Sequence, residues 1–390
     1  MTSTARLNLP LKLSILIFIV CLAIGFELAR HRPVWNDEIY TQQSSVEKPS
    51  YYGILFKHLE EGNNCPIFYI VQKAIGDLTH YKFPGPWKGE WQVKDMRSQI
   101  IMRIQANIFS ALTIALIFYF FARYYSLAAG AYALLVTLSS FMIWAYWVDA
   151  RPYSIWVFLT TVQCLLVLCI IGEKDDERRN WRWLMITHLF LSFTVIMSIV
   201  QVVVVSVVLW LFKDRNWKRY IGLTIIPSLI SIFYYSRAIK FQFSFPNTPI
   251  QLIGASIPKD RVLILVLYAV FLGGYYLYEK NKTPRIKDKL HKEGTAFLVL
   301  TMLMLLSAIV VIIRCKMSLV HGRIGFPVSN RHVIYLTPIG IIAVTLFSIH
   351  FYRTFADHKW ARILMILAFC GLLIFRVIRT YGQLQGLYIS

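Results

Sequence analysis

Long apolar runs dominate this sequence and limit the folds that it can adopt. Residues 103–122 and 154–171, for example, approach the ~20 residues that an α-helix needs to cross a bilayer. Hydrophobic residues make up 57% of the 390 residues and charged residues only 16%, whereas about a quarter of the residues in soluble domains are charged. The runs are continuously apolar rather than alternating, which excludes a transmembrane β-barrel. The sequence therefore predicts an all-α polytopic membrane protein with a single domain over residues 1–390 and no separate soluble domain.

About eleven membrane-spanning helices follow from the hydropathy pattern. They are predicted at residues 13–29, 103–122, 128–147, 154–171, 184–212 (two helices), 220–236, 262–278, 295–313, 333–349 and 363–378. The stretch 184–212 is too long for one upright span, so we expect two short helices hinged near residues 198–201. A single long tilted helix is the alternative, and it would reverse the side of every later loop. Gln201, inside this stretch, is expected to link helices through hydrogen bonds.

The first predicted loop, residues 30–102, is long and carries its own helical patterns. Residues 51–59 and 66–78 alternate apolar and polar side chains at helical spacing, and Pro66 suits the first turn of the second of these helices. Amphipathic helices of this kind usually lie in the plane of the membrane interface. We therefore expect an extracytoplasmic loop with interfacial helices.

The net charge of +21 is best explained by membrane topology. Lys and Arg hold loops on the cytoplasmic side and meet anionic headgroups, and no basic face on a soluble domain indicates nucleic-acid binding. The first apolar segment follows Arg6 and Lys12 and lacks a small-residue cleavage site, so it is expected to be a retained helix. The basic loops predict a cytoplasmic N-terminus, and we expect a multi-pass protein of the bacterial inner (plasma) membrane. Residues 37–38, 149–151, 237–261 and 314–331 then lie on the outer side.

Ionisable residues lie at the ends of several predicted helices on that outer side. They are Asp37, Glu38, Asp149, Arg151, Arg323 and Arg331. Charged side chains at membrane depth are costly and tend to mark function. A carboxylate can take a proton from an acceptor hydroxyl while guanidinium groups hold a phosphate leaving group in a bidentate manner. A phosphate on a long lipid would meet these residues at the level of the headgroups.

Each of these residues also has a purely structural interpretation. Asp37 can be a solvated loop acid, and Glu38 can orient its neighbour instead of reacting. Asp149 and Arg151 can form a local ion pair in a tight turn. Arg331 can anchor its helix at the interface, as arginines often do.

Cysteine and histidine residues show no spacing typical of a zinc site. Cys65 and Cys315 fall in loops assigned to the same outer side, and a disulfide and two free thiols both stay open for them.

Five short motifs follow one another along the chain. They are Asp37-Glu38 after the first helix; Asn64-Cys65-Pro66-Ile67-Phe68-Tyr69; Arg103 at the start of the second helix; Asp149-Ala150-Arg151-Pro152-Tyr153; and Asn330-Arg331-His332-Val333 leading to Pro338. In this order they resemble the GT-C superfamily of membrane glycosyltransferases, most closely the branch of protein O-mannosyltransferases and aminoarabinose transferases. The resemblance covers about residues 10–350.

The resemblance implies a GT-C-like bundle and a polyprenyl-phosphate-linked sugar as donor. It implies transfer on the extracytoplasmic face to a lipid, glycan or protein acceptor, by a single inverting displacement. Asp37 would be the general base with Glu38 supporting it in the catalytic pair, and Arg151 and Arg331 would bind the donor phosphate. Supporting roles fall on Asp149, Tyr153, Asn64, Tyr69 and Arg103. No cofactor is implied, and a divalent cation stays open because arginines alone can hold a phosphate.

Two positions depart from the motifs of that branch. Asn64 and Cys65 stand where a histidine is usual, and Asp149 stands where glutamate is commoner. Two other functions are therefore kept: a transporter or flippase of lipid-linked sugars, and a non-catalytic membrane assembly protein. Many transporters have internal repeats, and no clear repeat relates the halves of this chain. An outer cavity around Asp37 would favour the enzyme, and a path through the bilayer would favour the transporter.

Overall fold

The computed structural model describes residues 3–57, 66–85, 92–195, 197–238, 289–320, 333–354 and 359–388. The described residues form an all-α fold, apart from one pair of two-residue strands. Within them, five helical stretches are long and apolar enough to cross a membrane: Leu9–His31, Met96–Tyr124, Tyr153–Ile171, Leu336–Arg353 and Arg362–Gln385. These stretches indicate a multi-pass membrane protein, as the sequence predicts. The predicted helix at 262–278 lies outside the described residues, and the number of about eleven spans stays a prediction.

The helices of the bundle follow the predicted order. The longest are α1 (Ser3–His31), α6 (Ile104–Tyr124), α9 (Tyr153–Ile171), α16 (Lys289–Val320), α17 (Leu336–Thr354) and α18 (Lys359–Tyr388). Between them lie α7 (Leu127–Leu138), α8 (Phe141–Tyr146), α10 (Glu177–Ser192), α11 (Ser198–Phe212), α12 (Trp217–Tyr220), the π-helical segment η2 (Ile221–Ile225) and α13 (Ile226–Ala238). The separate helices α10 and α11 confirm the prediction of two helices in 184–212, with the turn slightly earlier than expected.

The prediction of one continuous helix over 128–147 is wrong, because α7 ends at Leu138 and α8 begins at Phe141. The hydroxyl of Ser139 donates a hydrogen bond to the carbonyl of Val136 at 2.9 Å. The carbonyl of Ser139 in turn accepts one from the hydroxyl of Thr380 on α18, also at 2.9 Å. Serine side chains compete with the helix for backbone groups, and this competition separates α8 from α7.

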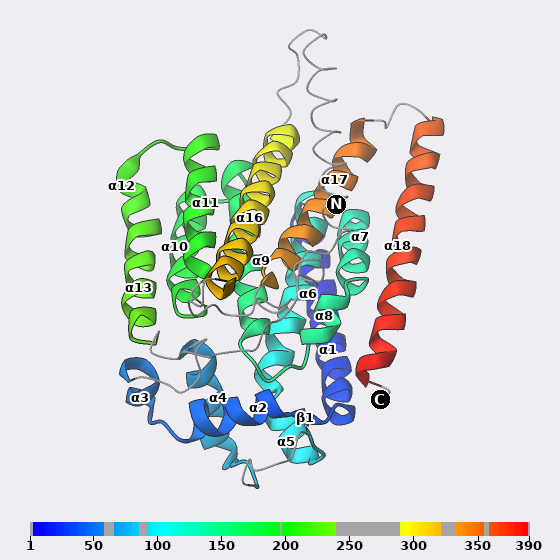
Figure 1. Ribbon diagram of the computed structural model, residues 1–390. Helices are drawn as coiled ribbons and strands as arrows, with labels where there is room; N and C mark the ends of the chain where they lie inside the picture. The colour runs from blue at the N-terminus through cyan, green and yellow to red at the C-terminus, as the bar shows by residue number, and fades with distance from the viewer. Residues whose placement is uncertain are drawn as a thin grey trace.

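The loop of residues 30–102 caps one end of the bundle. It contains β1 (Val34–Trp35), α2 (Asn36–Tyr40), the π-helical segment η1 (Thr41–Glu47), α3 (Tyr51–Phe56), α4 (Pro66–Thr79), β2 (Gln92–Val93) and α5 (Met96–Ile101). The two strands pair antiparallel, and α3 and α4 confirm the two helices predicted in this loop. In Figure 1 these elements lie at the bottom, where α18 also ends, whereas α12 lies at the opposite end. The orientation of these ends relative to the membrane stays a prediction.

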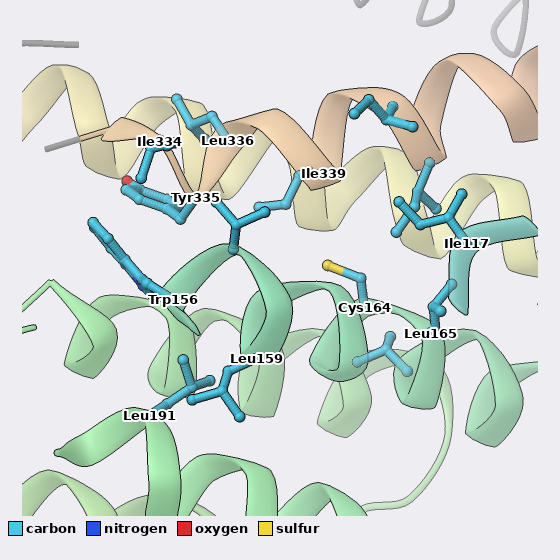
Figure 2. Close-up of a cluster of buried hydrophobic side chains, with 14 of the residues drawn as sticks. Ile117, Trp156, Leu159, Cys164, Leu165, Leu191, Ile334, Tyr335, Leu336 and Ile339 are labelled. Atoms are coloured by element: carbon cyan, nitrogen blue, oxygen red, sulfur yellow. The ribbon is translucent and has the colours of Figure 1, made fainter. Parts of the chain in front are cut away.

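Figure 2 shows a part of the core to which α6, α9, α10, α17 and the residues just before α17 contribute side chains. The rings of Trp156 and Tyr335 lie 5.2 Å apart between centroids. The indole nitrogen of Trp156 donates to the Gln201 side-chain oxygen at 2.7 Å, and the Gln201 amide nitrogen donates to the Thr160 hydroxyl at 3.0 Å. Gln201 therefore links α11 to α9, which confirms its predicted part as a helix-to-helix contact.

A polar cluster joins the loops at the end of the bundle opposite α2. The ammonium group of Lys174 lies 2.7 Å from a carboxylate oxygen of Glu293 on α16, and both side chains are largely buried. The hydroxyl of Tyr125 also donates to this carboxylate. The cluster fixes α16 against the loops that follow α6 and α9.

Candidate functional site

A cavity of about 290 Å³ opens where α2, α8 and the turn between α8 and α9 meet. One part of its lining is charged and includes Arg32, Asp37, Glu38, Asp149 and Arg151. The other part is formed by aromatic and apolar side chains, namely Trp35, Phe141, Met142, Ala145, Tyr146 and Tyr153. A cavity with a charged side and an apolar side suits an amphiphilic ligand. Its lining joins residues 32–38 of the loop that caps the bundle to residues 141–153 of α8, the following turn and the start of α9.

The adjacent acids Asp37 and Glu38 point in different directions. Both lie in the first turn of α2, where successive side chains are about 100° apart around the helix axis. Asp37 is exposed at the cavity, whereas Glu38 is only 1% exposed. The amide of Trp35 donates to a Glu38 carboxylate oxygen at 2.8 Å and fixes the start of the helix. One acid of the pair is thus open to a ligand and the other is enclosed by protein.

Glu38 forms a buried ion pair with Arg103. The guanidinium Nε donates to Oε1 at 3.0 Å and Nη2 donates to Oε2 at 2.6 Å, which is a bidentate geometry. The amide of Ala150 donates to Oε1 at 2.7 Å. With the Trp35 amide, the carboxylate accepts four hydrogen bonds. These contacts join α2 to the start of α6 and to the turn between α8 and α9.

Arg103 also organises the backbone that follows α1. Its side chain donates to the carbonyls of Ala29 at 3.2 Å and Pro33 at 2.7 Å, and to the carbonyl of Arg32. Arg103 is 0% exposed. The arginine therefore holds residues 29–33 in one place, directly beside Glu38.

The pKa of Glu38 reflects two opposing effects. Burial raises it, but the charge of Arg103, its hydrogen bond and the nearby Arg32 outweigh burial and hold the pKa below its ordinary value. Glu38 is therefore ionised at neutral pH, and its charge is balanced by Arg103.

Asp149 has a different environment, although it lies close by. Burial raises the pKa of Asp149 to about 6, the charge of Glu38 adds to the rise, and Arg32 and Arg151 oppose it. No hydrogen bond to its carboxylate is found within the described residues. A cavity carboxyl group that titrates near neutral pH is a candidate for acid–base chemistry or for contact with an anion.

Arg151 connects the turn between α8 and α9 to α2. Its Nη1 donates to the carbonyl of Asp37 at 3.1 Å and to the hydroxyl of Thr41 at 2.9 Å. Its guanidinium carbon lies 5.9 Å from the centre of the Tyr153 ring. Arg151 thus fixes the backbone of Asp37 and places a positive charge at the wall of the cavity.

The structure brings together five of the predicted site residues around this cavity: Asp37, Glu38, Asp149, Arg151 and Tyr153. Arg103 lies beneath them as the partner of Glu38. Tyr69 is fully buried in the main hydrophobic core and is not part of the cavity lining. Asn64 and Arg331 lie outside the described residues, as do Arg323 and Cys65.

Arg32 is a site residue that the sequence analysis did not single out. It lines the cavity and is 8% exposed. A signal was present, since Arg32 lies between the first apolar segment and the Asp-Glu pair, but basic residues at such a place are expected as membrane anchors.

Oxygen ligands for a divalent cation would come from Asp37 and Asp149, which both line the cavity. Across the described ranges, no group of three or more His, Cys, Asp or Glu side chains is arranged to hold a metal ion. The need for a cation therefore stays open.

No protein-family model matches the chain, and a search of curated proteins finds no match either.

Proposed function

We propose that this protein is a membrane glycosyltransferase of the GT-C type, which transfers a sugar from a polyprenyl-phosphate-linked donor. The observation that carries the proposal is the cavity at the capped end of the bundle. It combines an exposed carboxylate, Asp37, with arginines and an apolar wall. A lipid-linked sugar phosphate has the matching parts: a polar sugar, an anionic phosphate and an apolar chain.

The proposed reaction is a single inverting displacement. Asp37 accepts the proton of an acceptor hydroxyl, and the hydroxyl oxygen forms a bond to the anomeric carbon. The bond between that carbon and the phosphate oxygen breaks, and the polyprenyl phosphate leaves with the electron pair. Arg151 stabilises the charge that develops on the phosphate. Arg331 lies outside the described residues, and its proposed role in binding the donor phosphate rests on the motif alone.

Glu38 has a positioning part in this proposal. Its four accepted hydrogen bonds and its pairing with Arg103 make it a fixed group rather than a base. It supports Asp37 by holding α2 in place. Asp149 and Tyr153 line the same cavity and would contact the donor.

The remaining features of the proposal come from topology and motif order. They are a bundle of about eleven spanning helices, a bacterial inner membrane, a cytoplasmic N-terminus and a reaction on the extracytoplasmic side with a lipid, glycan or protein acceptor. A transporter or flippase would place its polar groups near the midplane of the bilayer. The charged residues of this site instead come from the segment after α1, from the short helix α2 and from the turn between α8 and α9, not from the middle of a spanning helix, which favours the enzyme.

A donor panel tests the proposal. Purified protein is incubated with polyprenyl-phosphate sugars and a crude membrane extract as the acceptor source, and release of free polyprenyl phosphate is measured. Wild type is expected to release it from at least one donor, and Asp37→Asn is expected to release none while keeping its fold. Asp77→Asn is the matched control, because Asp77 is an exposed acid of the same loop that contacts Tyr51 rather than the cavity.

Unchanged turnover in Asp37→Asn would refute its role as base. No release from any donor in the presence of the extract would refute the transferase and favour the transporter or the assembly protein.

A further inference from the structure

Arg32 follows α1 directly, and its backbone is held firmly in place. Its amide donates to the carbonyl of Leu28 at 3.2 Å. Its carbonyl accepts hydrogen bonds from the Gln99 side chain at 3.0 Å and from Arg103. The direction in which the side chain leaves the backbone is therefore set by α5 and α6.

The side chain of Arg32 turns into the protein, which is unusual for an arginine at the end of a membrane helix. Such arginines usually extend along the helix toward the headgroups. Arg30, two residues earlier, behaves in this way: it is exposed and pairs with Glu27 at 3.3 Å. Arg32 is instead 8% exposed, and its Nη1 donates to the carbonyl of Ala145 on α8 at 3.1 Å. The contact places its guanidinium group against the wall of the cavity.

Arg32 and Arg151 are the cationic side chains among the described residues that line the cavity. Arg103 is enclosed beneath the lining and is balanced by Glu38. Arg32 comes from the end of α1 and contacts α8, whereas Arg151 comes from the start of α9 and contacts α2. The two guanidinium groups thus reach the cavity from different elements. Planar guanidinium groups recognise phosphate oxygens with pairs of parallel N–H donors.

The apolar side of the cavity adjoins Arg32. Ala145, whose carbonyl accepts the Arg32 hydrogen bond, lies on α8 together with Phe141 and Met142, which also line the cavity. A ligand phosphate at Arg32 would therefore have an apolar surface within reach of its lipid chain. This combination matches a phosphate esterified to an isoprenoid alcohol.

We propose that Arg32 binds the phosphate group of the lipid-linked donor together with Arg151, and that α8 contacts the first isoprene units. The inference rests on the proposed function, because it identifies the binding residues of the same site. It adds a donor-binding residue at the end of the first helix, outside the five sequence motifs.

A binding experiment on the purified full-length protein tests the inference without requiring transfer. Trp35 lines the cavity, so intrinsic fluorescence can follow binding. The probes are a polyprenyl phosphate, the corresponding polyprenol, phosphatidylglycerol and inorganic phosphate. Arg32→Gln is expected to weaken binding of polyprenyl phosphate about tenfold or more, with little change for polyprenol. Arg30→Gln removes the same charge from the same helix end and is expected to bind as wild type does.

Arg32→Lys keeps the charge but not the planar fork, and it is expected to bind with intermediate affinity. It also serves if Arg32→Gln fails to fold, because a lysine variant that binds polyprenyl phosphate like wild type would overturn the inference. Equal losses for phosphate and alcohol in Arg32→Gln would overturn it too, since they indicate a structural role. If phosphatidylglycerol binds with the same affinity as polyprenyl phosphate, the site recognises headgroups in general and the assignment is refuted. Binding of inorganic phosphate with that affinity would refute it as well.

The outcomes for Arg32 and for the transferase are separate. Phosphate-dependent binding that needs Arg32, with no transfer from any donor, would retain the site and refute the enzyme. Transfer by wild type, together with unchanged polyprenyl phosphate binding in Arg32→Gln, would retain the enzyme and refute the role of Arg32.

Discussion

Replacing Glu38 is expected to lower the stability of the protein, whereas replacing Asp37 is expected to abolish activity and leave stability nearly unchanged. Glu38→Gln removes a carboxylate that accepts two hydrogen bonds from Arg103 and two from backbone amides. The guanidinium group of Arg103, which is 0% exposed, would then be buried without a balancing charge. Removing one partner of a buried ion pair costs about 3–5 kcal/mol. Asp37→Asn changes an exposed side chain, and its effect on the free energy of unfolding is expected to stay within about 0.5 kcal/mol.

The measurement is the free energy of unfolding of the purified protein in detergent micelles, with denaturant and tryptophan fluorescence. Arg103→Met and the double variant with Glu38→Gln complete a double-mutant cycle. The sum of the losses of unfolding free energy in the two single variants is expected to exceed the loss in the double variant by at least about 1 kcal/mol. The reason is that each single variant leaves one buried charge without its partner. A loss of less than about 1 kcal/mol in Glu38→Gln would refute the reasoning, and so would an equally large loss in Asp37→Asn.

Three further predictions concern other parts of the molecule. The pKa of Asp149 is raised to about 6 in the folded protein, which therefore binds this proton more tightly than the unfolded chain does. The free energy of unfolding should fall as pH rises through about 6. The difference in unfolding free energy between wild type and Asp149→Asn should show this pH dependence. Gln201→Leu leaves the Trp156 indole without its 2.7 Å acceptor and should lower the free energy of unfolding by about 1–2 kcal/mol, whereas a change below about 0.3 kcal/mol would contradict the link. Glu293→Gln weakens the contact with Lys174 and should lower the free energy of unfolding by about 2 kcal/mol in the same denaturant experiment. Glu177→Gln, which changes an exposed acid, should leave it almost unchanged.

The hydropathy pattern was sufficient to predict the five long apolar helices of the described residues, because each of them contains a continuous apolar stretch. The separation of α10 from α11 was predictable from the length of the apolar stretch alone. The break between α7 and α8 was not, because Ser139 and Ser140 hardly interrupt the apolar run. At the break, the carbonyl of Ser139 accepts a hydrogen bond from Thr380, far along the chain. The strands β1 and β2 are only two residues long and have no periodicity that a sequence could reveal.

Some of the predicted site residues line the cavity, but their contacts could not be predicted. The basic loops predicted the same side of the membrane for Asp37, Asp149 and Arg151, and these three residues line one cavity. The pairing of Glu38 with Arg103, 65 positions apart, could not be predicted because charged residues of both signs occur near several helix ends. Arg32 was missed because the sequence context of a membrane anchor and that of an inward-facing arginine are the same. The burial of Arg32 and its contact with the Ala145 carbonyl distinguish them.

The two acids of the pair have different roles, positioning the site and accepting a proton, and a single carboxylate could not fulfil both. A group that positions the site must be fixed by many contacts, as Glu38 is, and those contacts lower its pKa and occupy its oxygens. A base must instead have an accessible oxygen, which Asp37 provides on the exposed side of the same short helix. Arg103 pairs with Glu38, but the charge of Glu38 still contributes to the raised pKa of Asp149. The charges of the cavity lining are those of Asp37, Glu38, Asp149, Arg32 and Arg151. Protonation of Asp149 near pH 6 shifts their sum by one charge in the direction that favours an anionic ligand.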